Sequence, residues 1–292
     1  AAVLPTFFGG SADLSHSNMT FIKGDGLQDD EHRTERNVQF GVREFAMATV
    51  LNGLTLHGGV RVFGGTFFVF SDYLKAALRL SALQNLPVTY VFTHDSIAVG
   101  EDGPTHEPIE HLASLRTIPN TYVFRPADAT ETQAAWYLSQ KTNDRPTSIV
   151  LTRQNLPILE NSSFEKVAKG AYVVYETAAD FDTILIATGS EVALAIDVAR
   201  ELETDGSKVR VVSMPSVELF EEQPKEYKEE LLPLSVRRRV SLEMGNSALW
   251  YKYVGLDGLA IGIDKFGASA PANKVIEEYG FTVEAVVEKI KN

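Results

Sequence analysis

Ionisable side chains gather between residues 93 and 108, in a segment that also contains glycine and proline. His94, Asp102 and His106 are the groups most suited to chemistry there. The apolar run at residues 88–92 predicts a buried strand just before them, so we expect the segment at the carboxyl end of a strand. Ligands of open α/β sheets bind at such ends. Imidazole and carboxylate groups in that place could exchange protons with a substrate.

A metal site is the alternative interpretation of this region, with His94, Asp102, His106 and His111 as ligands. Imidazole nitrogens and carboxylate oxygens are common zinc ligands. However, the flexible glycine spacing between these residues does not enforce one coordination geometry. We therefore assign no metal ligand within this chain.

A single acid, Glu44, stands at the start of an apolar helical pattern that covers residues 42–56. An acid at a helix N-terminus is stabilised by the helix dipole, which explains Glu44 without any ligand. Alternatively, a half-buried acid could share a proton with a ligand nitrogen. The spacing alone leaves both interpretations open.

Three aromatic residues, Phe67, Phe70 and Tyr73, recur at every third position after Gly64 and Gly65. This spacing predicts that the rings share one face of a helical turn. Core packing explains such a stripe without a ligand. A flat heteroaromatic ligand could also stack on the rings, because we expect the preceding glycines to leave a gap above them.

Two glycines followed by small polar residues, among them Asp13 and Ser17, form the segment at residues 9–18. Glycine lets the backbone approach a ligand closely, although many ordinary turns have this composition.

Short β-branched runs alternate with amphipathic stretches along the whole chain, the pattern of parallel sheets covered by helices. In the first half we expect strands at 60–63, 88–94, 121–125 and 148–153, and helices at 42–56, 73–84 and 130–141. In the second half we expect strands at 172–175, 183–188, 209–213, 239–243 and 259–263, a helix after Gly189 and another at 282–290. The sequence thus predicts two consecutive three-layer α/β domains with mainly parallel sheets, at residues 1–155 and 171–292, joined by a linker at 156–170.

The chain has 292 residues, with 39 acidic and 27 basic side chains and a formal net charge of −12. Such a charge repels polyanions, so we expect neither nucleic acid nor membrane as a partner. Cysteine is absent, which excludes disulfides and thiolate metal ligands. No apolar run approaches the roughly 18 residues that cross a bilayer. We expect a cytoplasmic protein, and, because the chain opens Ala1-Ala2 without methionine, a portion of a longer polypeptide.

Taken in order, these segments resemble the transketolase family. The matching stretches are GGSADLSHSN at 9–18, VREFAM at 42–47, GGTFFVFSDY at 64–73, THDSIAVGEDGPTHEP at 93–108, RPAD at 125–128, LTRQNLP at 151–157, ATGSEV at 187–192 and FGASAPAN at 266–273. The resemblance runs from end to end and implies a thiamine diphosphate pyrimidine-binding domain followed by a transketolase C-terminal domain. One departure is Phe45, where other members commonly have histidine.

The resemblance implies a role for each candidate residue. Transketolases of the pentose phosphate pathway move a two-carbon ketol unit between sugar phosphates, using thiamine diphosphate and Mg²⁺. By resemblance, Glu44 hydrogen-bonds the pyrimidine nitrogen N1′, a contact that activates the cofactor. The rings of Phe67, Phe70 and Tyr73 surround the pyrimidine, and Asp13 faces the cofactor.

By the same resemblance, His106 lies beside the hydroxyl and carbonyl of the donor sugar, where protons are transferred. Asp102 hydrogen-bonds the sugar hydroxyls. His94, Ser17 and Arg153 match the positions that hold the substrate phosphate, a role that suits the permanently charged guanidinium.

In this family a separate N-terminal domain holds the diphosphate and metal through a Gly-Asp-Gly motif and a later asparagine. Gly24-Asp25-Gly26 and Asn52 imitate that motif, but Asn52 falls inside the helix expected at 42–56 rather than in a loop after a strand. We therefore expect that this chain lacks the N-terminal domain, that it forms a homodimer and that it is inactive alone.

Other identities share part of this pattern. The β subunit of a 2-oxoacid dehydrogenase and a fragment of deoxyxylulose phosphate synthase have the same pyrimidine-binding acid, but neither is expected to carry His94, Asp102 and His106. A natural split transketolase and a catalytically silent dimerisation module are the remaining alternatives.

Overall fold

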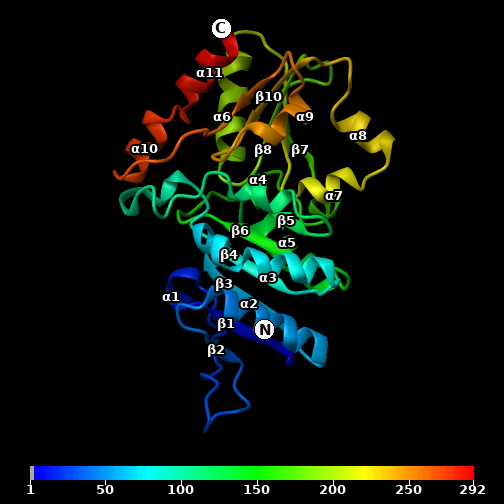
Figure 1. Cartoon of the computed structure of the whole chain (residues 1–292). Helices are drawn as coiled ribbons and strands as arrows, with labels where there is room; N and C mark the ends of the chain where they lie inside the picture. Colours follow the sequence, from blue (N-terminus) through cyan, green and yellow to red (C-terminus); the bar gives the residue numbers. More distant parts are fainter. Residues whose placement is uncertain (1–2) are drawn as a thin grey trace.

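The computed structural model describes residues 3–292 as two sheets flanked by helices (Figure 1). The first sheet has six parallel strands in the order β2-β1-β3-β4-β6-β5. The strands are β1 (Phe7–Ser11), β2 (Asn37–Gln39), β3 (Arg61–Phe67), β4 (Thr89–Thr93), β5 (Tyr122–Phe124) and β6 (Thr147–Leu151). The α-helices of this half are α1 (Ser15–Asn18), α2 (Glu44–His57), α3 (Ser71–Leu83), α4 (His111–Arg116) and α5 (Ala129–Lys141). Two 3₁₀ helices, η1 (Phe68–Phe70) and η2 (Ile97–Asp102), follow β3 and β4.

Helices cover both faces of the first sheet. On one face, α2 and α3 pack side by side, and their apolar residues share a core with Tyr90 and Phe92 of β4 (Figure 1). On the other face, α5 packs on Phe124 and Ile149. Side chains alternate between the two faces because successive residues of a strand point in opposite directions. Val150, next to Ile149, accordingly belongs to the core under α2 and α3.

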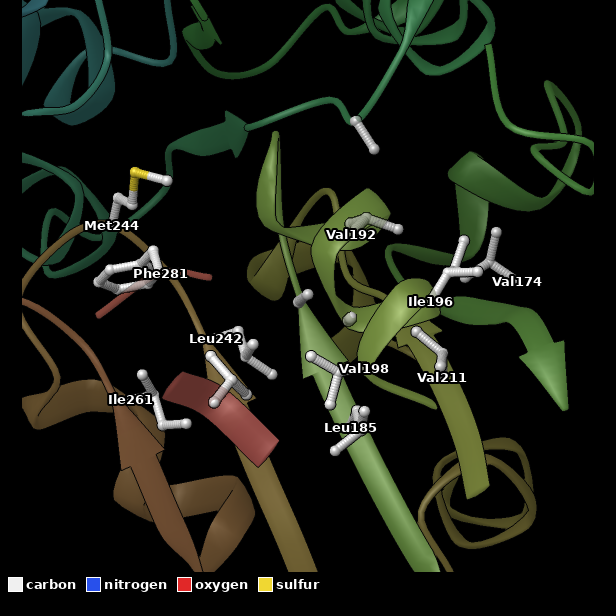
Figure 2. Close-up of a cluster of buried hydrophobic side chains, with 14 of the residues drawn as sticks. Val174, Leu185, Val192, Ile196, Val198, Val211, Leu242, Met244, Ile261 and Phe281 are labelled. Atoms are coloured by element: carbon white, nitrogen blue, oxygen red, sulfur yellow. The ribbon is translucent and has the colours of Figure 1, made fainter. Parts of the chain in front are cut away.

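The second sheet has five strands in the order β11-β10-β8-β9-β7, all parallel except β7, which is antiparallel to β9. The strands are β7 (Tyr172–Glu176), β8 (Thr183–Ala187), β9 (Val209–Ser213), β10 (Arg238–Leu242) and β11 (Leu259–Ile261). The helices are α6 (Glu191–Thr204), α7 (Val217–Glu221), α8 (Lys225–Leu231), α9 (Tyr251–Val254), α10 (Ala272–Glu278) and α11 (Val283–Lys291), with the 3₁₀ helices η3 (Lys166–Lys169) and η4 (Ala248–Trp250). Figure 2 shows the core on one face, where Val192 and Ile196 of α6 lie near Leu185 of β8 and Val211 of β9.

The two halves share a continuous core and a buried ion network. Ile149 of the first sheet and Leu185 of the second belong to one apolar cluster. Arg125, which follows β5, is fully buried and donates from Nε to Asp95 at 2.8 Å. Its Nη1 donates to the carbonyl of Thr188 at 3.1 Å and pairs with Glu191 in the second half. A buried arginine is tolerated because it is paired with two carboxylates. The network therefore ties the end of β4 to the start of α6.

The predicted fold class is confirmed: both halves are three-layer α/β structures with mainly parallel sheets. Every expected strand and helix is present, with ends that shift by a few residues. Residues 154–165 have no regular structure, and Lys166–Lys169 forms η3. Within residues 3–292 no helix combines the length and apolar character needed to span a membrane.

Two strands were missed, and one is longer than expected. The strands β1 and β2 were not predicted, and β3 continues past Phe63 through both glycines to Phe67. Glycine is depleted in strands, so Gly9 and Gly10 concealed β1. They are required here because a Cβ at Gly9 would lie 2.0 Å from the carbonyl oxygen of Phe63 on β3.

Candidate active site

The predicted site residues follow the carboxyl ends of the strands of the first sheet. They are Asp13 and Ser17 after β1, Glu44 after β2, Phe67 at the end of β3, His94 after β4 and Arg153 after β6. Because the strands are parallel, these ends share one edge of the sheet. Residues that lie far apart in the sequence are thereby brought to one region of the molecule.

Glu44 is the first residue of α2 and is only 7% exposed. Within residues 3–292 its carboxylate has no hydrogen-bond or ion-pair partner. The helix dipole favours the charge, but burial of an acid without a partner is costly. The carboxyl group is therefore available to a ligand at the sheet edge. The neighbouring Phe45 is half exposed, with 49% of its surface accessible.

The aromatic residues form a row of rings. Phe67 and Phe70 have ring centroids 6.2 Å apart, and Phe70 and Tyr73 have centroids 6.0 Å apart, with both pairs stacked. The His94 ring stacks on Phe67 at 3.7 Å, and the His106 ring meets Phe70 edge-on at 5.5 Å. Two residues expected at the substrate thus lie against the rings expected at the cofactor.

The expected helical turn is wrong in its detail. Phe67 ends β3, Phe70 lies in η1, and Tyr73 lies in the first turn of α3. The rings still align because the chain turns directly from the strand into a helix. Tyr73 is the most open of the three, at 65% exposure, whereas Phe67 is 9% exposed.

The expectation that Gly64 and Gly65 leave a gap above the rings is also wrong. Gly64 and Gly65 lie inside β3, where their lack of a side chain admits neighbouring elements. A Cβ at Gly64 would lie 2.5 Å from Cδ1 of Leu51 in α2, and one at Gly65 would lie 2.8 Å from Cγ2 of Thr20. These glycines therefore serve close packing of the protein on itself.

Four of the predicted substrate residues interact through their charges. Burial lowers the pKa of His94, and the positive charge of Arg153 lowers it further. Asp102 acts in the opposite direction and raises this pKa, and His106 lowers it. Asp102 and Arg153 are exposed, while His106 is half-buried. The structure therefore brings His94, Asp102, His106 and Arg153 into one electrostatic environment.

The alternative metal site is not supported, because within residues 3–292 no three of its four residues bring their ligand atoms close enough together to share a metal ion. His111 is buried and directed toward another group, with Nε2 3.3 Å from the carboxylate of Asp72. Nδ1 of His94 lies 2.9 Å from the hydroxyl of Thr93. Asp72 also meets the ammonium of Lys75 at 3.2 Å, which already supplies a cation there.

The two residues that imitate the diphosphate motif, Asp25 and Asn52, likewise bond to other groups of the protein. Asp25 pairs with the guanidinium of Arg36, whose Nε lies 2.8 Å away. Asn52 is buried inside α2, where it donates to the carbonyl of Ala77 at 3.0 Å and accepts from Ser81 at 2.6 Å. The nitrogen and the oxygen of the Asn52 amide therefore both hold α2 against α3. The residues present fit a pyrimidine ring better than they fit a metal-bound diphosphate.

Some residues that shape the site were not singled out from the sequence. Ser11, Asn18 and Thr93 connect three strand ends through buried hydrogen bonds. Arg125 holds Asp95, the neighbour of His94. The motif RPAD at 125–128 entered only as part of the resemblance, and no physical signal in the sequence marked Arg125 as buried.

Two family models match the chain. Residues 1–158 match the transketolase pyrimidine-binding domain, and residues 170–282 match the transketolase-like C-terminal domain. A probable transketolase of Streptococcus pneumoniae is 72% identical over 292 residues, and a transketolase of Bacillus subtilis is 58% identical over 295 residues. Each match covers 100% of this chain but 44% of the relative, so the chain spans less than half the length of these proteins.

Solved structures give the same result. A transketolase variant from Pichia stipitis superposes with a TM-score of 0.94 at 43% identity, over 98% of this chain and 43% of that one. A split-gene transketolase, described as an inactive β4 tetramer, has a TM-score of 0.78 at 26% identity, over 98% of this chain and 91% of that one. Fold and similarity together define a pyrimidine-binding domain followed by a transketolase-like C-terminal domain. The chain belongs to the transketolase family.

Proposed function

We propose that this chain is the pyrimidine-binding and C-terminal portion of an enzyme that transfers a two-carbon ketol unit from a ketose phosphate to an aldose phosphate. The observation that carries the proposal is the buried carboxylate of Glu44, which has no protein partner among the described residues and lies at the same sheet edge as the aromatic row. Thiamine diphosphate, when bound, supplies the nucleophilic carbon for this chemistry. The carboxyl group of Glu44 would hold a proton at N1′ of the pyrimidine.

The other cofactor residues would position the pyrimidine ring. Phe70 and Tyr73 offer ring faces, with Phe67 behind them, and Asp13 lies exposed on the loop after β1. Aromatic faces bind flat heteroaromatic rings by offset stacking. The diphosphate and Mg²⁺ would be held by an N-terminal domain outside this chain, because Asp25 and Asn52 are engaged elsewhere.

The substrate residues would divide the sugar phosphate between them. His106 would move protons at the donor hydroxyl and carbonyl, and Asp102 would accept hydrogen bonds from the sugar hydroxyls. Arg153, His94 and Ser17 would bind the phosphate. The shared electrostatic environment of His94 and Arg153 supports this division.

The domain division proposed is residues 1–155, a linker at 156–170, and residues 171–292. The active enzyme would be a cytoplasmic homodimer of the pentose phosphate pathway, in which the N-terminal domain of one subunit covers this portion of the other. We infer that this chain alone self-associates and is inactive. The split-gene relative, whose matching chain forms an inactive tetramer, supports that inference.

The decisive experiment compares this chain alone with the complete enzyme, meaning this chain together with an N-terminal diphosphate-binding domain. The complete enzyme should transfer a ketol unit to ribose 5-phosphate. Decarboxylation of pyruvate without ketol transfer would instead indicate a 2-oxoacid dehydrogenase or deoxyxylulose phosphate synthase, and inactivity of the complete enzyme in both assays would indicate a silent dimerisation module.

Sedimentation of the chain alone should reveal an oligomer. Calorimetric titration of the same material with thiamine diphosphate and Mg²⁺ should reveal no tight binding, because most charge-assisted contacts to the diphosphate are absent. Micromolar, metal-dependent binding would contradict the assignment of the diphosphate site to another domain.

A further inference from the structure

A chain of buried hydrogen bonds leads from the middle of the first sheet to His94. The hydroxyl of Ser11 donates to the carbonyl of Gly65 at 2.9 Å, and the amide nitrogen of Asn18 donates to Ser11 at 2.9 Å. The hydroxyl of Thr93 donates to the amide oxygen of Asn18 at 2.7 Å. Nδ1 of His94 then lies 2.9 Å from the Thr93 hydroxyl oxygen. The chain joins the ends of β1, β3 and β4.

The direction of these bonds is fixed at the sheet. A backbone carbonyl only accepts, so Ser11 must give its single hydrogen to Gly65. The hydroxyl of Ser11 has no second hydrogen, so toward its other neighbours its oxygen can only accept. It accepts from the backbone nitrogen of Leu14 at 3.2 Å and from the amide nitrogen of Asn18. The side chain of Asn18 therefore presents its oxygen at the other end of the amide.

The same reasoning assigns the proton of the imidazole. Thr93 gives its only hydrogen to Asn18, so its oxygen can only accept from His94. Nδ1 of His94 must then carry a hydrogen, which leaves the lone pair of a neutral ring on Nε2. Within residues 3–292 no protein group hydrogen-bonds Nε2.

The charged groups around His94 favour its neutral form. Burial is the largest cause of its lowered pKa, and Arg153 acts in the same direction. His106 also lowers the pKa, while Asp102 and Asp95 raise it without reversing the shift. Asp95 is partly neutralised by Arg125, to which it is bonded at 2.8 Å. Before a ligand binds, His94 at neutral pH is therefore an acceptor at Nε2.

We propose that binding of a phosphate group at this site is coupled to the uptake of one proton, shared between the group and Nε2 of His94. The inference rests on the proposed function, which puts the substrate phosphate beside His94 and Arg153. The dianion of a phosphate monoester offers only acceptors, and an acceptor cannot bond to a lone pair. The complex therefore needs a hydrogen on Nε2 or on the phosphate. Arg153 contributes charge at every pH, so the dependence on pH comes from the proton that His94 and the phosphate share.

The tautomer can be tested on this chain without any ligand. Nitrogen-15 shifts of the imidazoles, with His94→Gln to assign the signals, distinguish a hydrogen on Nδ1 from one on Nε2. We expect the Nδ1–H tautomer at pH 7.5. An Nε2–H tautomer, or an imidazolium, at this pH would overturn the proposal.

The coupling can be tested with sulfate and with inorganic phosphate, followed by the His94 signals in the same samples. Sulfate has no proton to give near neutral pH, so its affinity should fall about tenfold per pH unit above the pKa of His94. Both anions should raise the pKa of His94. Sulfate binding that is independent of pH would overturn the coupling and leave the phosphate site intact. Failure of both anions to bind at high concentration would overturn the phosphate site itself, and the coupling with it.

Thr93→Val is the matched variant, because valine has the shape of threonine without its hydroxyl. The variant removes the acceptor at Nδ1, so a neutral ring is free to carry its hydrogen on Nε2 and to donate to sulfate. We expect sulfate affinity in this variant to depend less steeply on pH than in the wild type. An unchanged slope would show that Thr93 does not fix the tautomer. If the variant does not fold, the wild-type slope and tautomer still decide the proposal.

Discussion

The imidazole ring of His94 lies on the ring of Phe67, with centroids 3.7 Å apart and planes inclined by 23°. The contact joins the ends of β4 and β3. His94 covers one face of the Phe67 ring, so that face packs against the protein itself and is closed to a ligand. The more open faces are those of Phe70 and Tyr73.

This arrangement predicts that Phe67 and Tyr73 differ in their effects. Phe67→Ala should lower the free energy of unfolding by about 3–5 kcal/mol, as expected for a large buried ring. Tyr73→Ala should change it by less than about 0.5 kcal/mol, because the ring is exposed. In the complete enzyme, Tyr73→Ala should weaken thiamine diphosphate binding by about 0.5–1.5 kcal/mol through lost stacking. Thermal unfolding and cofactor titration measure the two effects, and equal destabilisation by both variants would contradict this division.

A second prediction concerns Glu44. In the complete enzyme, Glu44→Gln should abolish most ketol transfer while the fold is kept, because the amide cannot share a proton with N1′. A general acid–base contribution is about 10²–10⁴-fold, and we expect a loss near the upper end since this group activates the cofactor itself. Exchange of the thiazolium proton gives the direct measurement. Wild-type exchange in the variant would show that Glu44 serves only the helix terminus.

Arg153 should distinguish phosphorylated from unphosphorylated sugars. Arg153→Ala should lower kcat/KM for ribose 5-phosphate by roughly ten- to hundredfold, the loss of about 1.5–3 kcal/mol for one charge-assisted contact. Ribose itself should be affected little. Arg200→Ala, which removes an exposed arginine on α6 that pairs with Asp197, serves as the control. Equal losses for the two sugars would mean that Arg153 has a structural role.

The sequence predicted the elements with a strong apolar period and missed those without one. β4 was expected from its apolar run and α2 from its apolar helical pattern, although the buried residues of α2 also include Glu44 and Asn52. β1 was missed because Gly9 and Gly10 are untypical of strands. These residues are glycine because neighbouring strands pack closely against them, and the local sequence pattern cannot reveal such a contact.

The site was predicted as a set of residues but not as a geometry. Resemblance indicated which residues to consider, and the parallel sheet explains why they share an edge. The stacking of His94 on Phe67 and the direction of the bonds from Ser11 depend on contacts between distant parts of the chain. Arg125 is the clearest case, because its partner Glu191 comes from the other half of the molecule.

The last prediction concerns Glu107, the neighbour of His106, which is buried at the seam between the two halves. A Cβ at Gly267 would lie 1.7 Å from Oε2 of Glu107, so the carboxyl group lies directly against the loop between β11 and α10. Burial raises its pKa from 4.5 to about 7, although the backbone amides of Ala268 and Gly100 face it and act in the opposite direction. Neither carboxylate oxygen completes a hydrogen bond.

This raised pKa fixes the sign of a dependence of stability on pH. Between about pH 4.5 and 7 the folded protein binds a proton at Glu107 that the unfolded chain has lost, so stability falls as pH rises through this window. Glu107→Gln removes the ionisation. The variant should match the wild type near pH 5 and be more stable by about 2 kcal/mol at pH 8, which raises Tm by several degrees. Glu101→Gln, an exposed position in the same loop, should show no such difference. Thermal unfolding at the two pH values provides the measurement. If the difference in stability between Glu107→Gln and the wild type stays constant from pH 5 to 8, the pKa of Glu107 is not raised at the seam.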